Sequence, residues 1–163
     1  MRSMKYLLDT DAFSDIVRGN VQVEWQFSRT PPSMVGISSV TVKEIEYGRR
    51  RCPTRVTHRG AVIDSLLQRI EVVPFGEDAA YVTGQLRASL ARAGTPIGPY
   101  DVMIAGTALI HGLILVTANT REFSRVFGLQ LENWRELSTE VRENTAVYRV
   151  NVKSPPRVPD GRW

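Results

Sequence analysis

The stretch that decides the fold is Tyr6-Leu7-Leu8-Asp9-Thr10-Asp11, a short apolar run that ends on acidic residues. Residues 5–8 predict a strand buried on both faces, as in a parallel sheet covered by helices. An acidic side chain where a buried strand meets solvent is costly to desolvate unless it is paired or binds a cation. The stretch therefore predicts an α/β sheet with a polar site at its edge.

Three later segments place a polar residue beside an apolar or loop run: Glu44, Asp101 and Asn119. The runs are Val35-Gly36-Ile37-Ser38-Ser39, Pro96-Ile97-Gly98-Pro99-Tyr100 and Leu113-Ile114-Leu115-Val116-Thr117. Open α/β sheets hold their ligands at the carboxyl ends of the strands. Acidic groups that converge there would suit a hard divalent ion such as Mg²⁺.

The rest of the pattern alternates strands with helices. Helical spacing predicts helices over residues 12–18, 21–27, 40–50, 62–70, 77–92 and 101–111, and strands over 35–38, 72–73 and 113–116, with an edge strand at 129–131. Such alternation favours a three-layer α/β/α fold with a mostly parallel central sheet. From Ser138 the pattern lapses, so we predict one domain over 1–137 and a partly disordered extension over 138–163.

The amino-acid composition indicates the broad class of protein. The 163 residues are 42% hydrophobic, enough for one domain with a core. No apolar run approaches the roughly 20 residues of a membrane span, and the N-terminal one is too short for a signal peptide. The single Cys52 fits a reducing cytosol, so we expect a cytoplasmic protein. Twenty-one Lys and Arg against 17 Asp and Glu give a charge of +4, compatible with nucleic acid.

Four segments together resemble the motif blocks of PIN-domain ribonucleases, above all the VapC toxins of bacterial type II toxin–antitoxin systems. The blocks are residues 6–11, Ile37-Ser38-Ser39-Val40-Thr41-Val42-Lys43-Glu44, Pro96-Ile97-Gly98-Pro99-Tyr100-Asp101-Val102-Met103-Ile104-Ala105 and Leu115-Val116-Thr117-Ala118-Asn119-Thr120-Arg121-Glu122-Phe123. Residues 127–134 are similar to the closing segment of that group. The resemblance covers residues 4–135 and implies a PIN-like fold.

The resemblance also implies an endoribonuclease that depends on Mg²⁺ or Mn²⁺. Its catalytic residues carry over to Asp9, Glu44, Asp101 and Asn119. Divalent ions activate water and stabilise charge on phosphate oxygens during phosphodiester hydrolysis. We expect Asp9 and Asp101 to touch the metal and Glu44 to bind it through water or orient the attacking water. Asn119 is a neutral acceptor, so a second metal position should be weak.

Neighbouring polar residues admit two interpretations. Thr10, Ser39 and Thr117 follow strand ends, where they could hold the carboxylates by hydrogen bonds or serve as caps and turn residues. Asp11 could add charge to the site, but we favour a helix cap. For Tyr100 we favour a packing role over base stacking. The run Arg49-Arg50-Arg51 could line an RNA groove, although a solvated face is the commoner explanation.

The resemblance implies partners as well. We expect an RNA substrate, a homodimer, and a cognate antitoxin whose C-terminal segment lies over the site in a higher assembly. One alternative is a non-catalytic, antitoxin-binding co-repressor, which the cost of three buried like charges disfavours. The other is a haloacid-dehalogenase-type phosphatase with Asp9 as nucleophile. That family's expected Gly-Thr-Leu pattern is absent after Asp11, and no late acidic pair follows Asn119.

Overall fold

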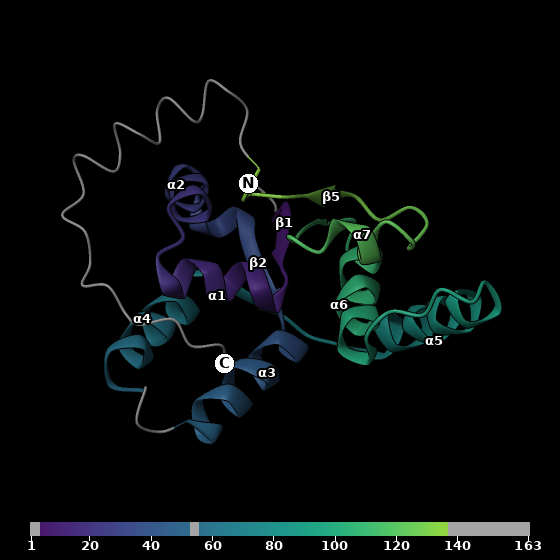
Figure 1. Cartoon of the computed structure of the whole chain (residues 1–163), viewed down its shortest axis with the longest axis horizontal. Helices are drawn as coiled ribbons and strands as arrows, with labels where there is room; N and C mark the ends of the chain where they lie inside the picture. The colour runs from purple at the N-terminus through teal and green to yellow at the C-terminus, as the bar shows by residue number, and fades with distance from the viewer. Residues whose placement is uncertain (1–3, 53–55, 137–163) are drawn as a thin grey trace.

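The computed structural model describes residues 4–52 and 56–136 (Figure 1). Its centre is one sheet of five parallel strands in the order β3-β2-β1-β4-β5. The strands are β1 (Tyr6–Leu8), β2 (Val35–Ser38), β3 (Glu71–Val73), β4 (Ile114–Val116) and β5 (Leu131–Glu132). The predicted parallel α/β sheet is confirmed.

The central strand β1 lies at a change of direction in the topology. Leu7 pairs with Gly36 of β2 on one side and with Leu115 of β4 on the other. Strands β2 and β3 lie on the first side of β1. Strands β4 and β5, which come later in the sequence, lie on its second side. In open α/β sheets such a switch point opens a crevice at the carboxyl ends of the strands. Asp9 lies at this point, and its N–H donates to the Val116 carbonyl at 3.0 Å.

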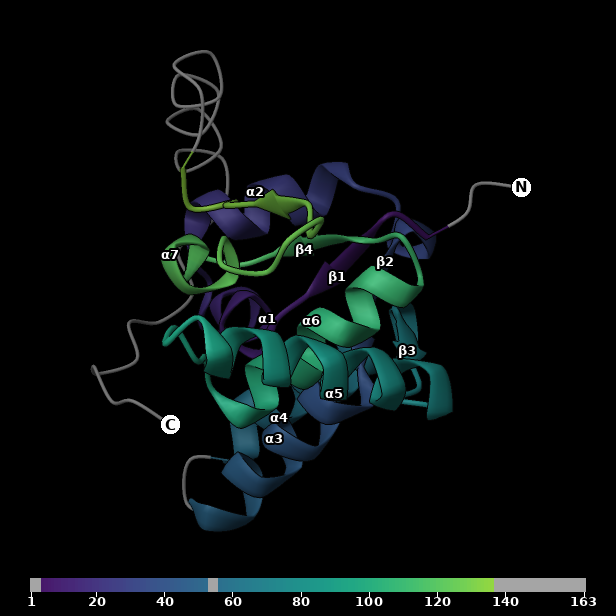
Figure 2. The same ribbon diagram turned by 90° about the vertical axis from the view of Figure 1, so that its right-hand side faces the viewer.

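Helices cover both faces of the sheet and give the three predicted layers (Figures 1 and 2). The helices are α1 (Thr10–Arg18), α2 (Val21–Arg29), α3 (Ser39–Arg51), α4 (Val56–Arg69), α5 (Glu77–Arg92), α6 (Pro99–Ile110) and α7 (Thr120–Phe123), with a 3₁₀ turn at Pro32–Met34. One apolar cluster joins the sheet to α1, α2 and α4, and a second joins it to α5, α6 and α7. Helix α3 contributes to both because it leaves the carboxyl end of β2.

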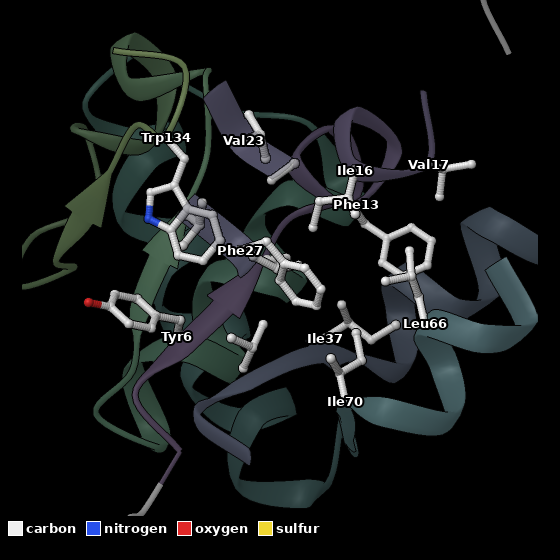
Figure 3. Packing of buried hydrophobic residues seen from close by; sticks show 14 of the residues in the cluster. Tyr6, Phe13, Ile16, Val17, Val23, Phe27, Ile37, Leu66, Ile70 and Trp134 are labelled. Carbon is white, nitrogen blue, oxygen red and sulfur yellow. The ribbon is translucent and has the colours of Figure 1, made fainter. Parts of the chain in front are cut away.

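Side-chain alternation along β1 divides the core between these clusters. Tyr6 and Leu8 point into the cluster with α1, α2 and α4, whereas Leu7 points into the other. Figure 3 shows the first cluster, in which Trp134 closes over Tyr6. The two rings meet edge to face, with centroids 5.4 Å apart and planes at 71°. The C-terminal part of the domain is thereby packed onto its first strand.

Most element boundaries match the predictions within two residues, but α4 begins at Val56 rather than at residue 62, so this helix is longer than its apolar stripe. Helix α1 begins at Thr10 because Asp9 caps it, and α6 begins at Pro99 because proline suits the first helical turn. The edge strand is 131–132 rather than 129–131. The predicted extension over 138–163 lies outside the described residues. Within the described part, no helix is long and apolar enough to cross a membrane.

Candidate active site

The first candidate residue, Asp9, is a buried carboxylate at the end of the central strand. It is 4% exposed, and its Oδ1 accepts a hydrogen bond of 2.7 Å from the Ala12 N–H, which caps α1. Burial raises the pKa of Asp9 to about 7, because desolvation outweighs the hydrogen bonds from Thr117 and Ala12 that lower it. Nearby negative charges on Asp11 and Asp101 raise this pKa further.

Asp101 occupies the first turn of α6 and is only partly buried. Its pKa is raised to about 6, first by desolvation and then by three neighbouring carboxylates, Glu44, Glu122 and Asp11. Asp9 and Asp101 therefore lie near enough to act on each other, although 92 positions separate them in the sequence. Negative charge is concentrated where β1, α3, α6 and α7 meet.

A hydrogen bond fixes Glu44, the third candidate carboxylate. The Thr10 hydroxyl donates to Glu44 Oε2, which joins the first turn of α1 to the second turn of α3. Thr10 thus holds Glu44 rather than its neighbour Asp9. One carboxylate oxygen of Glu44 is occupied by this bond, and its position relative to α1 is set by it.

Asn119 and Thr117 follow the end of β4. Thr117 is 1% exposed, and its Oγ1 accepts a hydrogen bond of 2.9 Å from the Asn119 N–H. Thr117 also lies near enough to Asp9 to lower the pKa of that carboxyl, so it lies between two of the four predicted positions. Asn119 stands at the N-cap of α7 without using its side chain as a cap, which leaves its amide available to a ligand.

The structure bears on the interpretations of three neighbouring residues. Asp11 is not the cap of α1, because Asp9 occupies that position; Asp11 is instead exposed and adds negative charge near Asp9 and Asp101. Ser39 Oγ accepts a hydrogen bond of 2.9 Å from the Phe75 N–H, and no hydrogen bond joins Ser39 to a carboxylate of the residues that the structure describes. Tyr100 is partly packed, since 46% of the residue is exposed and Lys43 Nζ lies 3.1 Å from the centroid of its ring.

Two charged residues near the site were not predicted from the sequence. Glu122 raises the pKa of Asp101, and its one sequence signal was its place one helical turn after Asn119. Arg135 forms a two-bond ion pair with Asp15 on α1, at 2.6 and 2.9 Å. No local pattern signals this pair, because its partners are 120 positions apart.

The donor set fits a hard divalent cation. It consists of carboxylate and amide oxygens, with Asp9 buried at a pKa of about 7, so its charge is costly unless a cation offsets it. Among residues 4–52 and 56–136, no three Asp, Glu, His or Cys side chains already stand where they could hold one ion together.

The position of the Asp101 carboxylate depends on the absence of a side chain at Gly98. A Cβ built at Gly98 would lie 2.7 Å from Asp101 Oδ2. Gly98→Ala should displace this carboxylate, and we expect RNA cleavage to fall about 10- to 100-fold, since small misplacements of reacting groups have effects of this size. Because φ at Gly98 is −53°, alanine fits the backbone there. Denaturant unfolding should show a loss below about 1 kcal/mol.

Gly84→Ala is the matched control. Gly84 lies inside α5, and nothing is within 4 Å of a Cβ built there. Alanine should raise the free energy of unfolding by up to about 1 kcal/mol and leave cleavage unchanged. Equal activities of the two variants would contradict the role of Gly98.

The fold and this edge of the sheet define the class of protein. Residues 6–129 match the family model described as "PIN domain", which covers more than half of the chain. The chain is 44% identical over 133 residues to the "tRNA(fMet)-specific endonuclease VapC" of Shigella flexneri, and 40% identical over 133 residues to the protein of the same name from Salmonella typhimurium. Each alignment covers 80% of this chain and 98% of the relative.

A solved structure agrees with these relatives. The DNA-bound VapBC structure from Salmonella typhimurium contains a chain with a TM-score of 0.73 and 40% identity, and the match covers 80% of this chain and 98% of that one. This chain belongs to the PIN-domain family, in its group of VapC ribonuclease toxins. It is accordingly an endoribonuclease and the toxin of a toxin–antitoxin pair.

Proposed function

We propose that the chain cuts RNA by hydrolysis at the carboxyl edge of the sheet, with Asp9 and Asp101 as the ligands of a Mg²⁺ ion, for which Mn²⁺ could substitute. The observation that carries this proposal is the buried Asp9 carboxylate beside Asp101, each with its pKa raised toward neutrality. Such an arrangement is unfavourable when both groups are ionised, unless positive charge is brought between them.

The remaining side chains have separate roles in this proposal. A bound divalent ion lowers the pKa of its water and stabilises the negative charge that grows on phosphate oxygens. Glu44, held by Thr10, either binds the ion through a water or orients the attacking water. Thr117 keeps the Asp9 carboxylate in place, and Asn119 offers one neutral oxygen. That neutral donor makes one tightly held ion more favourable than two.

The substrate we propose is the initiator tRNA. The support is the identity of 40% and 44% to two proteins named tRNA(fMet)-specific endonucleases. Sequence-specific RNA recognition favours unpaired loops, whose bases can leave the stack and be contacted by a protein. Cleavage should therefore fall in a single-stranded loop of this tRNA.

Mapping of cut ends on total cellular RNA tests the proposal. With Mg²⁺ present, we expect new ends at one loop of the initiator tRNA, and with the metal chelated we expect none. Mn²⁺ should restore cleavage. Cuts spread over many RNAs would refute the proposed substrate but not the ribonuclease activity. Cleavage that survives chelation would refute the proposed dependence on a metal ion.

A cognate antitoxin is the proposed protein partner, in the cytosol. Support comes from solved VapBC structures of relatives, of which those from Salmonella typhimurium and Rickettsia felis are bound to DNA. A basic side chain of the antitoxin could offset the carboxylates in place of the metal. We propose a homodimer of the toxin within a larger, DNA-binding assembly, so co-repression accompanies catalysis rather than replacing it. Activity that is insensitive to the product of the neighbouring open reading frame would contradict this partner.

The phosphatase alternative is not supported. The PIN family match spans residues 6–129 and includes Asp9, the residue on which that alternative depended.

A further inference from the structure

The side chain of Ser38 lies where the elements that carry the predicted carboxylates meet. Ser38 ends β2, and the parallel register of β1 and β2, continued by one residue, sets it beside Asp9 at the carboxyl edge of the sheet. Its Oγ accepts a hydrogen bond of 3.2 Å from the Val40 N–H and so caps α3, the helix of Glu44. Ser38 is completely buried, so its contacts lie inside the domain.

The same hydroxyl contacts α6, the helix that bears Asp101. Ser38 Oγ lies 3.5 Å from Thr107 Oγ1, and the Thr107 hydroxyl donates to the Met103 carbonyl at 2.9 Å. A hydroxyl has one hydrogen to donate. Because Thr107 gives its hydrogen to Met103, Ser38 is the donor and Thr107 the acceptor in the contact between them. We call this contact the hydroxyl junction.

The hydroxyl junction is long, but Ser38 has no substitute for it. Hydroxyl pairs usually stand about 2.7–2.8 Å apart, so this contact is weak in itself. Both residues are completely buried, and the Ser38 hydroxyl donates no other hydrogen bond within the described part of the chain. Loss of Thr107 Oγ1 would leave a buried donor unpaired, which is costly. A shift of β2 against α6 would relieve that cost.

The spacing of α3 and α6 matters because their carboxylates repel each other. Glu44 raises the pKa of Asp101, so the two side chains act on each other between these helices. The helices are in contact (Figure 1), and at the surface Lys43 Nζ lies over the Tyr100 ring. The hydroxyl junction is the buried link. Without a bound cation, repulsion favours a wider separation, which the junction opposes.

We propose that Ser38 and Thr107 are positioning residues of the metal site, which hold α6 so that Asp101 stays within reach of an ion bound at Asp9. Neither residue touches the ion or the RNA. The inference rests on the proposed metal-dependent function and adds how the spacing of the ligands is maintained. Backbone hydrogen bonds make a helix stiff, so a displacement at Thr107 is passed to Asp101, about 9 Å earlier along α6.

Mn²⁺ binding to the full chain tests the hydroxyl junction, since the paramagnetic signal of free Mn²⁺ gives the affinity without RNA. Thr107→Val removes the hydroxyl and nearly keeps the shape of the side chain. Mn²⁺ affinity should fall about 10-fold, the lower end of the effect of residues that orient metal ligands. Ser38→Ala removes the donor instead and should weaken binding by a similar factor. Because the two variants approach the contact from opposite sides, either one decides if the other does not fold.

Two further variants separate positioning from stability. Thr107→Ser keeps the hydroxyl but loses a buried methyl group, so its melting temperature should fall while Mn²⁺ affinity stays at the value of the parent. Thr41→Val is the matched control, because Thr41 is a completely buried threonine on α3 whose hydroxyl has no hydrogen-bond partner among residues 4–52 and 56–136. It should also bind Mn²⁺ as the parent does. A purely structural role of Thr107 would instead make metal affinity follow the melting temperature.

Two results would overturn the inference. One is an unchanged Mn²⁺ affinity in Thr107→Val and Ser38→Ala. The other is a loss of affinity in Thr107→Ser as large as that in Thr107→Val, which would assign the effect to the methyl group rather than the hydroxyl. Failure of the proposed function gives a different result, because the parent chain itself would then bind no Mn²⁺.

Discussion

Asp9→Asn is expected to lower RNA cleavage more than about 100-fold, because even the residues that support metal ligands contribute about 10- to 100-fold. Asparagine is as good a helix cap as aspartate, so the bond from the Ala12 N–H should persist. The loss should therefore come from the missing charge rather than from an unfolded helix. Cleavage of the proposed substrate, the initiator tRNA, by the two proteins at equal concentration measures this loss.

The same substitution should stabilise the protein without metal. The pKa of Asp9 is about 7 in the folded chain against an ordinary value of 3.8, so the folded state binds the proton more tightly. Stability is then lost as the pH rises from about 4 through 7, and it changes little above that. Asp101, with a pKa of about 6, also lowers stability as the pH rises, over a lower pH range.

Thermal unfolding in the presence of a chelator tests whether stability falls as the pH rises. The melting temperature of the parent should fall between about pH 5 and pH 8, and Mg²⁺ should restore it at pH 8 by binding the folded state. The fall should be smaller in Asp9→Asn, which should melt higher than the parent at pH 8. Asp78→Asn, an exposed carboxylate on α5, should behave as the parent does. A parent that is more stable at pH 8 than at pH 5 in chelator would contradict the cost assigned to Asp9.

Arg135→Ala is expected to lower the free energy of unfolding by about 2 kcal/mol. It leaves Asp15, whose side chain is 7% exposed, without its cation. Breaking a buried pair costs about 3–5 kcal/mol, and we expect less here because the Arg135 side chain is 42% exposed and water screens it. Urea unfolding measures the loss.

A double mutant tests whether the loss in Arg135→Ala comes from the unpaired charge of Asp15. Asp15→Asn combined with Arg135→Ala should recover most of the loss, because no unpaired carboxylate remains. The ion pair Arg50–Glu46 serves as the control, since its side chains are 84% and 48% exposed. Arg50→Ala should therefore cost no more than about 0.5 kcal/mol. Losses of equal size in Arg50→Ala and Arg135→Ala would show that burial of Asp15 has no energetic consequence.

Local patterns in the sequence determined most of the fold. Apolar runs such as residues 6–8 and 113–116 are buried on both sides, and only a parallel sheet between helices provides two apolar faces. The boundaries of α1 and α6 were less certain, because capping by Asp9 and the first-turn proline at Pro99 depend on side-chain geometry rather than on hydrophobic period.

The sequence by itself also determined which carboxylates to consider, since Asp9, Glu44 and Asp101 each follow a strand or loop end in a recognisable block. Only the tertiary structure decided what these residues meet. In the folded chain Thr10 donates a hydrogen bond to Glu44, Arg135 forms an ion pair with Asp15, and Lys43 makes a cation–π contact with Tyr100. These contacts join residues 34 to 120 positions apart, and no local period encodes them. The same packing sets the burial of Asp9, and burial is what raises its pKa toward neutrality.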